Sequence, residues 1–126
     1  MTGSHWARLK VEGSYPLRRG AWYSVSAFVR DEVVVHVGRS WLSVPWSAVE
    51  LTGTQPRRWT VVPRPANAVL LPEDWGAYYA VCPECCHRAP LRGTPETMHC
   101  PDCNRLSSVA WDEPYLGRTS PPEAGR

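Results

Sequence analysis

Two short cysteine motifs carry the clearest chemistry in this chain. They are Cys82-Pro83-Glu84-Cys85 and Cys100-Pro101-Asp102-Cys103. Fourteen residues separate the two motifs, and this spacing is typical of a four-thiolate metal site. Each motif supplies two sulfurs to one side of a tetrahedral ion, and the intervening loop lets the motifs face each other. The pattern predicts a structural Zn²⁺ bound by Cys82, Cys85, Cys100 and Cys103. Two disulfides or two redox pairs are the alternatives, and neither explains a second Cys-Pro-x-Cys at this distance.

A tetrahedral site closed by four thiolates has no open coordination position and does not activate water. Its ion stabilises a fold instead, and in small peptides such binding contributes about 10–16 kcal/mol. The stretch from Tyr78 to Asp112 resembles a zinc ribbon, a family of small β modules. The resemblance implies one strand at residues 79–81, entering the first motif, and another at residues 108–111, leaving the second. Zinc ribbons occur in polymerases, ribosomes, enzymes and adaptors, so the resemblance implies a metal without a particular function.

A fifth cysteine lies outside the two motifs. The residue after the second cysteine of such a motif often has a left-handed backbone, which Gly and Asn adopt most readily. Asn104 suits this position, and Cys86 suits it less well. We interpret Cys86 as a thiol outside the metal site. The alternatives are a ligand that replaces Cys85 and a nucleophile paired with His87, although adjacent side chains usually point apart. His99 is expected to be a surface residue.

Length and composition limit the classes of protein. The chain has 126 residues, enough for one ordinary domain or two small ones. It contains no apolar run of membrane-spanning length and no secretory signal pattern at its start. Thiols kept reduced for zinc suit the cytoplasm, with association at the cytoplasmic face of a membrane complex as a further location. The formal net charge is +2, and four thiolates with one Zn²⁺ would bring it close to zero. This balance argues against binding nucleic acid chiefly through phosphate attraction.

The rest of the pattern predicts an all-β protein. Residues 21–29 alternate and are rich in strand formers, residues 32–37 are the next strand, and Gly38-Arg39 reverses the chain into residues 40–44. Pro45 ends that strand because it has no N–H to donate. A helical turn at residues 46–48 and strands at 49–51 and 59–62 follow. This order of short strands resembles an SH3-like small barrel, and an open meander packed on the ribbon is the alternative.

The predicted organisation has five parts. They are an N-terminal extension (1–13), the small barrel (14–62), a Pro-rich connector (63–76), the zinc ribbon (77–112) and an irregular tail (113–126). Pro or Gly interrupts most windows, so no helix of ordinary length is expected. Seven Trp are many for this length, and two or three of them should be partly exposed.

The first functional hypothesis is a non-enzymatic accessory subunit that clamps components of a larger assembly. Surplus Trp, many Pro and the absence of a catalytic set of residues favour it. Candidate hosts are a polymerase, a ribosome, or the cytoplasmic face of a respiratory or photosynthetic membrane complex. The candidate partner-binding residues are Arg57, Arg58, Arg64, Arg88, Arg92, Arg105, Trp6 and Trp75.

The second hypothesis is a nucleic-acid-binding module of transcription or translation. Its arginines would contact phosphates, and exposed Trp or Tyr rings would stack on bases. An enzyme is the third hypothesis and the weakest. No Gly-rich phosphate loop or Ser/His/Asp arrangement is present, and only Cys86-His87 offers a candidate nucleophile and base.

Overall fold

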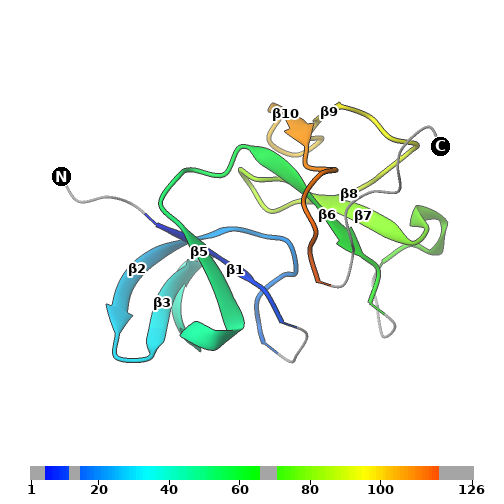
Figure 1. The fold of residues 1–126 in the computed structure, drawn as a ribbon. Coiled ribbons are helices and arrows are strands. Elements are labelled where there is room, and N and C mark those ends of the chain that lie inside the picture. Colours follow the sequence, from blue (N-terminus) through cyan, green and yellow to red (C-terminus); the bar gives the residue numbers. More distant parts are fainter. Residues whose placement is uncertain (1–4, 12–14, 66–70, 117–126) are drawn as a thin grey trace. The chain divides into compact units, whose positions relative to one another are not determined.

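The computed structural model describes residues 5–11, 15–65 and 71–116, which form two compact units. The first unit is Met1–Pro56 and the second is Arg57–Arg126 (Figure 1). The all-β prediction is confirmed: the described residues contain ten strands and two short 3₁₀ turns, with no α-helix among them. None of the described helical segments is long and apolar enough to cross a membrane. Expectations for residues 1–4, 12–14, 66–70 and 117–126 lie outside the described residues.

The first unit is one antiparallel sheet with the strand order β4-β3-β2-β1-β5. Its strands are β1 (Trp6–Leu9), β2 (Tyr23–Val29), β3 (Glu32–Val37), β4 (Ser40–Pro45) and β5 (Val49–Thr52). The predicted helical turn is present as η1 (Trp46–Ala48), between β4 and β5. β4 ends at Pro45, as expected.

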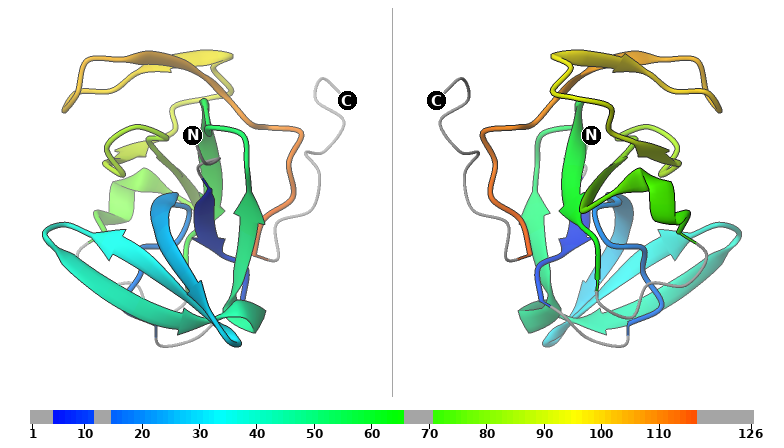
Figure 2. Two further views of the ribbon diagram at one scale, coloured as in Figure 1. Left: turned by 90° about the vertical axis from the view of Figure 1, so that its left-hand side faces the viewer. Right: turned by 90° about the vertical axis from the view of Figure 1, so that its right-hand side faces the viewer.

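β2 gives this sheet its curl (Figure 2). The start of β2 pairs with β1 through Tyr23 and Ser24, and the rest pairs with β3. The register shifts between Val25 and Ala27, and such a bulge bends the strand and increases its twist. β2 therefore pairs with β1 along one edge and with β3 along the other, and it bends between the two pairings. The bend curls the sheet into a half-barrel.

Alternation along the strands places the core of the first unit on one face of the sheet. In β3, Val33 and Val35 are buried, whereas Glu32 and His36 are exposed. Val44 of β4 is buried with them in a cluster that includes Ala7, Leu9, Leu17, Ala48 and Val49. Alternate side chains of β3 therefore face the core of this unit.

Arg8 is a buried charge in this unit that the sequence pattern does not reveal. Its side chain is 2% exposed and lies 2.8 Å from the Glu50 carboxylate on the neighbouring strand β5. The guanidinium also lies 4.4 Å from the centroid of the Trp22 ring. A buried charge is tolerated when it is paired in this way.

The second unit is a five-stranded sheet with the order β8-β7-β6-β10-β9. Its elements are β6 (Arg58–Pro63), η2 (Glu73–Trp75), β7 (Tyr78–Val81), β8 (Arg88–Pro90), β9 (Thr97–His99) and β10 (Leu106–Val109). The central strand β6 is antiparallel to β7 and parallel to β10. The other pairs, β7 with β8 and β9 with β10, are antiparallel hairpins.

Two strands lie elsewhere than the sequence suggested. We expected residues 59–62 to close the first unit, but β6 is the central strand of the second, and the boundary follows Pro56 rather than residue 62. Trp59 to Val62 are four consecutive buried residues, so β6 is buried on both faces, but this run alone does not specify which strands pair with it. β1 lies in the segment taken as an extension, where buried Arg8 interrupts the apolar pattern.

Candidate metal centre

Each cysteine motif lies at the turn of a β-hairpin in the second unit. β7 leads into Cys82, and the chain returns through β8, which pairs with β7 from Arg88 opposite Val81. β9 leads into Cys100, and the chain returns through β10, which pairs with β9 from Leu106 opposite His99. β6 lies between β7 and β10 and holds the two hairpins in one sheet. Two turns far apart in sequence thereby come together.

The two turns have the same backbone hydrogen bonds. The Cys82 N–H donates to the His87 carbonyl over 2.9 Å, and the Cys86 N–H donates to the Cys82 carbonyl over 3.1 Å. In the second turn, the Cys100 N–H donates to the Arg105 carbonyl and the Asn104 N–H to the Cys100 carbonyl, each over 2.9 Å. The repetition shows that the Cys-Pro-x-Cys sequence encodes one local structure twice.

The residue after each second cysteine has the left-handed backbone that the sequence suggested. Its φ angle is +66° at Cys86 and +64° at Asn104. Cys86 is therefore the residue that leads out of the first turn, and it lies outside the group of sulfurs that converge. The cysteine of the first turn that joins this group is Cys85. The reading of Cys86 as a substitute for Cys85 finds no support in this geometry.

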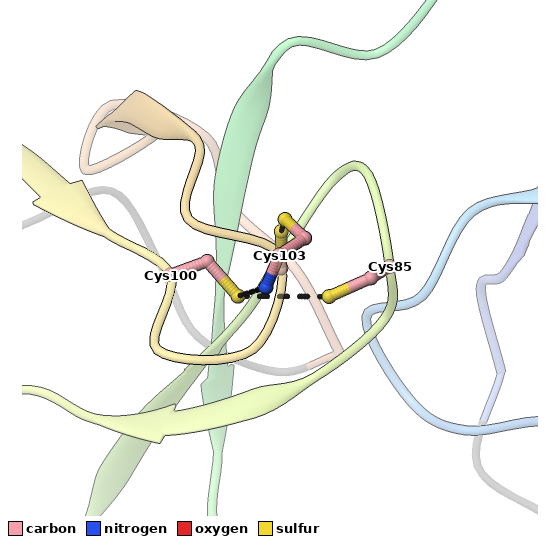
Figure 3. Close-up of side chains that lie close together, drawn as sticks. Cys85, Cys100 and Cys103 are labelled. Carbon is pink, nitrogen blue, oxygen red and sulfur yellow. Dashed lines mark hydrogen bonds between the residues drawn. The ribbon is translucent and has the colours of Figure 1, made fainter.

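The four motif sulfurs converge on one point. Figure 3 shows three of these cysteines, Cys85, Cys100 and Cys103. All four sulfurs lie within 4.8 Å of one another; Cys82 Sγ is 3.8 Å from Cys103 Sγ, and Cys85 Sγ is 3.5 Å from Cys100 Sγ. A tetrahedron of thiolates about 2.3 Å from a central Zn²⁺ has sulfurs about 3.8 Å apart. A disulfide needs sulfurs about 2.05 Å apart. The spacing fits a tetrahedral metal ion and not a disulfide.

Backbone N–H groups point at two of the sulfurs. Glu84 N–H donates to Cys82 Sγ over 3.3 Å, and the N–H groups of Asp102 and Cys103 donate to Cys100 Sγ over 3.4 Å each. Hydrogen bonds of this kind favour the thiolate form. They distribute part of the negative charge that four thiolates bring to one point.

The sulfurs lie partly within a small core. Cys82 and Cys100 are buried, whereas Cys85 and Cys103 are half-buried. Trp59 of β6 is fully buried in the same cluster, and its indole N–H donates to the Met98 carbonyl over 3.1 Å. Trp59 thus supports the site from the strand between the two hairpins. Sequence reasoning missed this role because it assigned residue 59 to the other unit.

Burial and crowding perturb the thiols. Burial raises the pKa of Cys82 from 9.0 to about 11, and burial also raises the pKa of Cys85. For Cys100, burial acts in the same direction, but hydrogen bonds from the Cys103 and Asp102 N–H groups and from neighbouring thiols lower the pKa overall. A bound divalent cation reverses this balance by stabilising every thiolate at once.

Among the predicted partner-binding arginines, three contact groups of their own unit. Arg58 pairs with Asp112 at 2.7 Å, and Arg92 lies 3.8 Å from Asp74. Arg64 donates to the carbonyls of residues 71, 72 and 76 and so holds the loop around η2. Arg57 and Arg105 are exposed and Arg88 is half-buried. Partner binding by these arginines stays a prediction.

The exposed tryptophans are not the two predicted as partner-binding residues. Trp6 and Trp75 are half-buried, and the Trp75 ring lies 6.4 Å from the Tyr79 ring. The exposed ones are Trp41 at 59% and Trp46 at 43%; Trp22 and Trp111 are also half-buried and only Trp59 is fully buried, so more tryptophans are partly exposed than the two or three expected. Strand alternation could have identified Trp41, because it lies opposite exposed His36 in the β3–β4 pair.

Comparison with known proteins adds no assignment. No family model matches the sequence, no curated protein matches it, and no solved structure matches the fold. The function of the site must therefore be inferred from its geometry. Four cysteine sulfurs are positioned to bind one metal ion, and their spacing is compatible with zinc.

Proposed function

We propose that this protein is a zinc-stabilised, non-enzymatic accessory subunit that binds components of a larger assembly through protein–protein contacts. The observation that carries the proposal is the convergence of four cysteine sulfurs, from two hairpin turns, at tetrahedral spacing. Four protein ligands close such a site, so its ion holds the hairpins together and has no position for a substrate. Structural zinc is the role that this arrangement supports.

The folds of the two units support the families suggested by the sequence. In the second unit, paired hairpins that each carry a Cys-x-x-Cys turn support a zinc ribbon. In the first unit, three features support an SH3-like barrel: the order β4-β3-β2-β1-β5, a long β2 shared between two neighbours, and η1 between β4 and β5. Both are small modules that recur as parts of larger assemblies.

Exposed apolar side chains in the first unit support protein–protein contacts. Phe28 is 44% exposed and Trp46 is 43% exposed, and their ring centroids are 5.5 Å apart. The His5 ring lies edge-on to Phe28, also at 5.5 Å. Val29, next to Phe28, is 50% exposed. Aromatic side chains at the surface are enriched in interfaces, where they provide contact area at little entropic cost.

Charge in the second unit disfavours nucleic acid as the main partner. The second unit, residues 57–126, contains eight arginines and eight acidic residues, a formal net charge of zero. Four thiolates with one Zn²⁺ would lower it to −2. A nucleic-acid-binding surface is normally basic, and three of these arginines are already engaged within the unit. Protein surfaces are therefore favoured over nucleic acid as the partner of this proposed subunit.

Affinity purification followed by mass spectrometry, with and without nuclease, tests the proposal. A defined set of proteins that survives nuclease supports it. A Phe28→Ser/Trp46→Ser variant should lose that set, whereas the control Leu106→Ser, which changes a 63% exposed residue of the second unit, should keep it. Partners that vanish with nuclease would overturn the proposal in favour of nucleic-acid binding.

A further inference from the structure

β4 is the outermost strand of the curled sheet, so one of its edges faces no other strand of that sheet (Figure 2). It has six residues, whereas the other outermost strands have four in β5 and three each in β8 and β9. Proteins commonly keep edge strands from pairing with other chains by making them short, charged or bulged. β4 is the longest outermost strand among the described residues.

The sequence of β4 contains no charged residue. It reads Ser-Trp-Leu-Ser-Val-Pro, and its register against β3 runs without a bulge from Ser40 to Pro45. Pro45, the last residue, is the only one of the usual blocking devices, and it leaves the other positions able to pair. The large apolar side chain of Trp41 is 59% exposed on the same strand. This edge has the properties that favour the addition of another strand.

The register identifies which backbone groups face the edge. In an antiparallel pair, residues alternate between those that bond the partner strand and those whose N–H and C=O point away from it. The Trp46 N–H donates to the Asp31 carbonyl over 3.0 Å, which fixes the alternation at the end of β4. Counting back by twos, Val44 and Leu42 bond to β3. Trp41 and Ser43 therefore direct their N–H and C=O groups to the free edge.

We propose that β4 pairs antiparallel with β4 of a second copy of this chain, about a two-fold axis at Leu42. In this register each Trp41 lies opposite Ser43 of the second copy, and the two residues exchange both backbone hydrogen bonds. The large indole then faces a small side chain, so the two Trp41 rings do not collide. Leu42 lies opposite its own counterpart. The pairing satisfies the edges of both copies by one self-complementary contact.

The alternative registers are poorer. An axis at Ser43 places Trp41 opposite Pro45 of the second copy, and Pro45 has no N–H to return the hydrogen bond. An uncharged strand also offers no electrostatic attraction to a charged partner, whereas it meets no like-charge repulsion from itself. The absence of like-charge repulsion and the match of Trp41 to Ser43 favour a second copy over a charged strand. This self-association is independent of the proposed partner binding, which uses Phe28 and Trp46.

Analytical ultracentrifugation of the zinc-loaded full chain over a wide concentration series tests the proposal. The weight-average mass should rise from the monomer value of 14.2 kDa toward twice that value. Ser43→Pro removes an N–H that faces the free edge, and Ser43→Lys places a charge there; both variants should stay monomeric. Ser24→Lys adds the same charge to an exposed position of β2 and should still dimerise. If Ser43→Pro fails to fold, Ser43→Lys decides the result.

Residue-resolved amide exchange separates this dimer from any other. As the concentration rises, exchange at the Trp41 and Ser43 amides should slow together. The Leu42 and Val44 amides already bond to β3 and should change little. A wild-type chain that stays monomeric at the highest concentration overturns the proposal. A dimer that survives both Ser43 variants, or that leaves the Trp41 and Ser43 amides unprotected, overturns it equally.

Discussion

The adjacent cysteines of the first turn provide the sharpest test of the metal site, because the structure gives them opposite roles. Cys85 contributes a sulfur to the four-sulfur group, whereas Cys86 occupies the left-handed position that follows it. Cys85→Ser should weaken metal binding and destabilise the second unit. Cys86→Gly should retain the metal and stabilise the fold slightly, because glycine adopts a φ of +66° without steric cost.

The expected magnitudes follow from this geometry. If four similar thiolates share a structural zinc binding energy of about 10–16 kcal/mol, each contributes about 3 kcal/mol. Loss of one then raises the zinc dissociation constant by about two orders of magnitude. At Cys86, a left-handed backbone costs a non-glycine residue about 1–2 kcal/mol, and glycine recovers most of it. Glycine also has more conformational freedom in the unfolded chain, which reduces this stabilisation by about 0.4–1 kcal/mol.

Competition with a chromophoric chelator measures the zinc dissociation constants, and thermal unfolding in excess zinc measures the stabilities. The predicted order of zinc affinity is wild type equal to Cys86→Gly, with Cys85→Ser much weaker. Cys100→Ser is a second ligand variant and should resemble Cys85→Ser. Retention of full affinity by Cys85→Ser, or its loss in Cys86→Gly, would refute the assignment of ligands.

Three further predictions concern the rest of the fold. Arg64→Ala should speed amide exchange in the loop around η2 by removing three carbonyl contacts, whereas exposed Arg57→Ala should not; equal rates in both would contradict the contact. Arg8→Met should change the free energy of unfolding little. Glu50→Leu leaves the buried guanidinium without its carboxylate and should lower the free energy of unfolding, measured by chemical denaturation, by about 3 kcal/mol. A larger loss in Arg8→Met than in Glu50→Leu would contradict this account of the ion pair. In the metal-free chain, the raised pKa of Cys82 contributes stability that is present below pH 9.0 and lost as the pH rises through about 11. With zinc the sign reverses, since binding requires thiolates, so stability should fall as the pH falls; unfolding at several pH values with and without chelator would expose a wrong sign.

The sequence predicted the local features of the fold well. Residues 32–37 form a strand with the predicted bounds, and the predicted helical turn is η1 at residues 46–48. These features depend on alternation and on Gly or Pro at turns, which act over a few residues. The cysteine pairs were equally readable, because their spacing is itself the constraint that brings four sulfurs together.

Pairing between distant strands was harder to predict. The run from Trp59 to Val62 is typical of a buried strand, but nothing in its own sequence says which other strands it will pair with. β1 was missed because Arg8 is buried in its middle, and the partner that makes this burial tolerable, Glu50, lies forty-two residues away. Residue patterns report local periodicity, whereas these placements depend on contacts between segments that are remote in sequence.

The central claim is that the four converging cysteines hold one zinc ion. Elemental analysis of the purified full chain, together with the absorption spectrum of the cobalt-substituted protein, measures this most directly. The account predicts one zinc per chain and a cobalt spectrum of tetrahedral thiolate type, with all four thiols protected from alkylation until the metal is removed. A chain that binds no metal under reducing conditions, or whose four cysteines are joined in two disulfides, would contradict it.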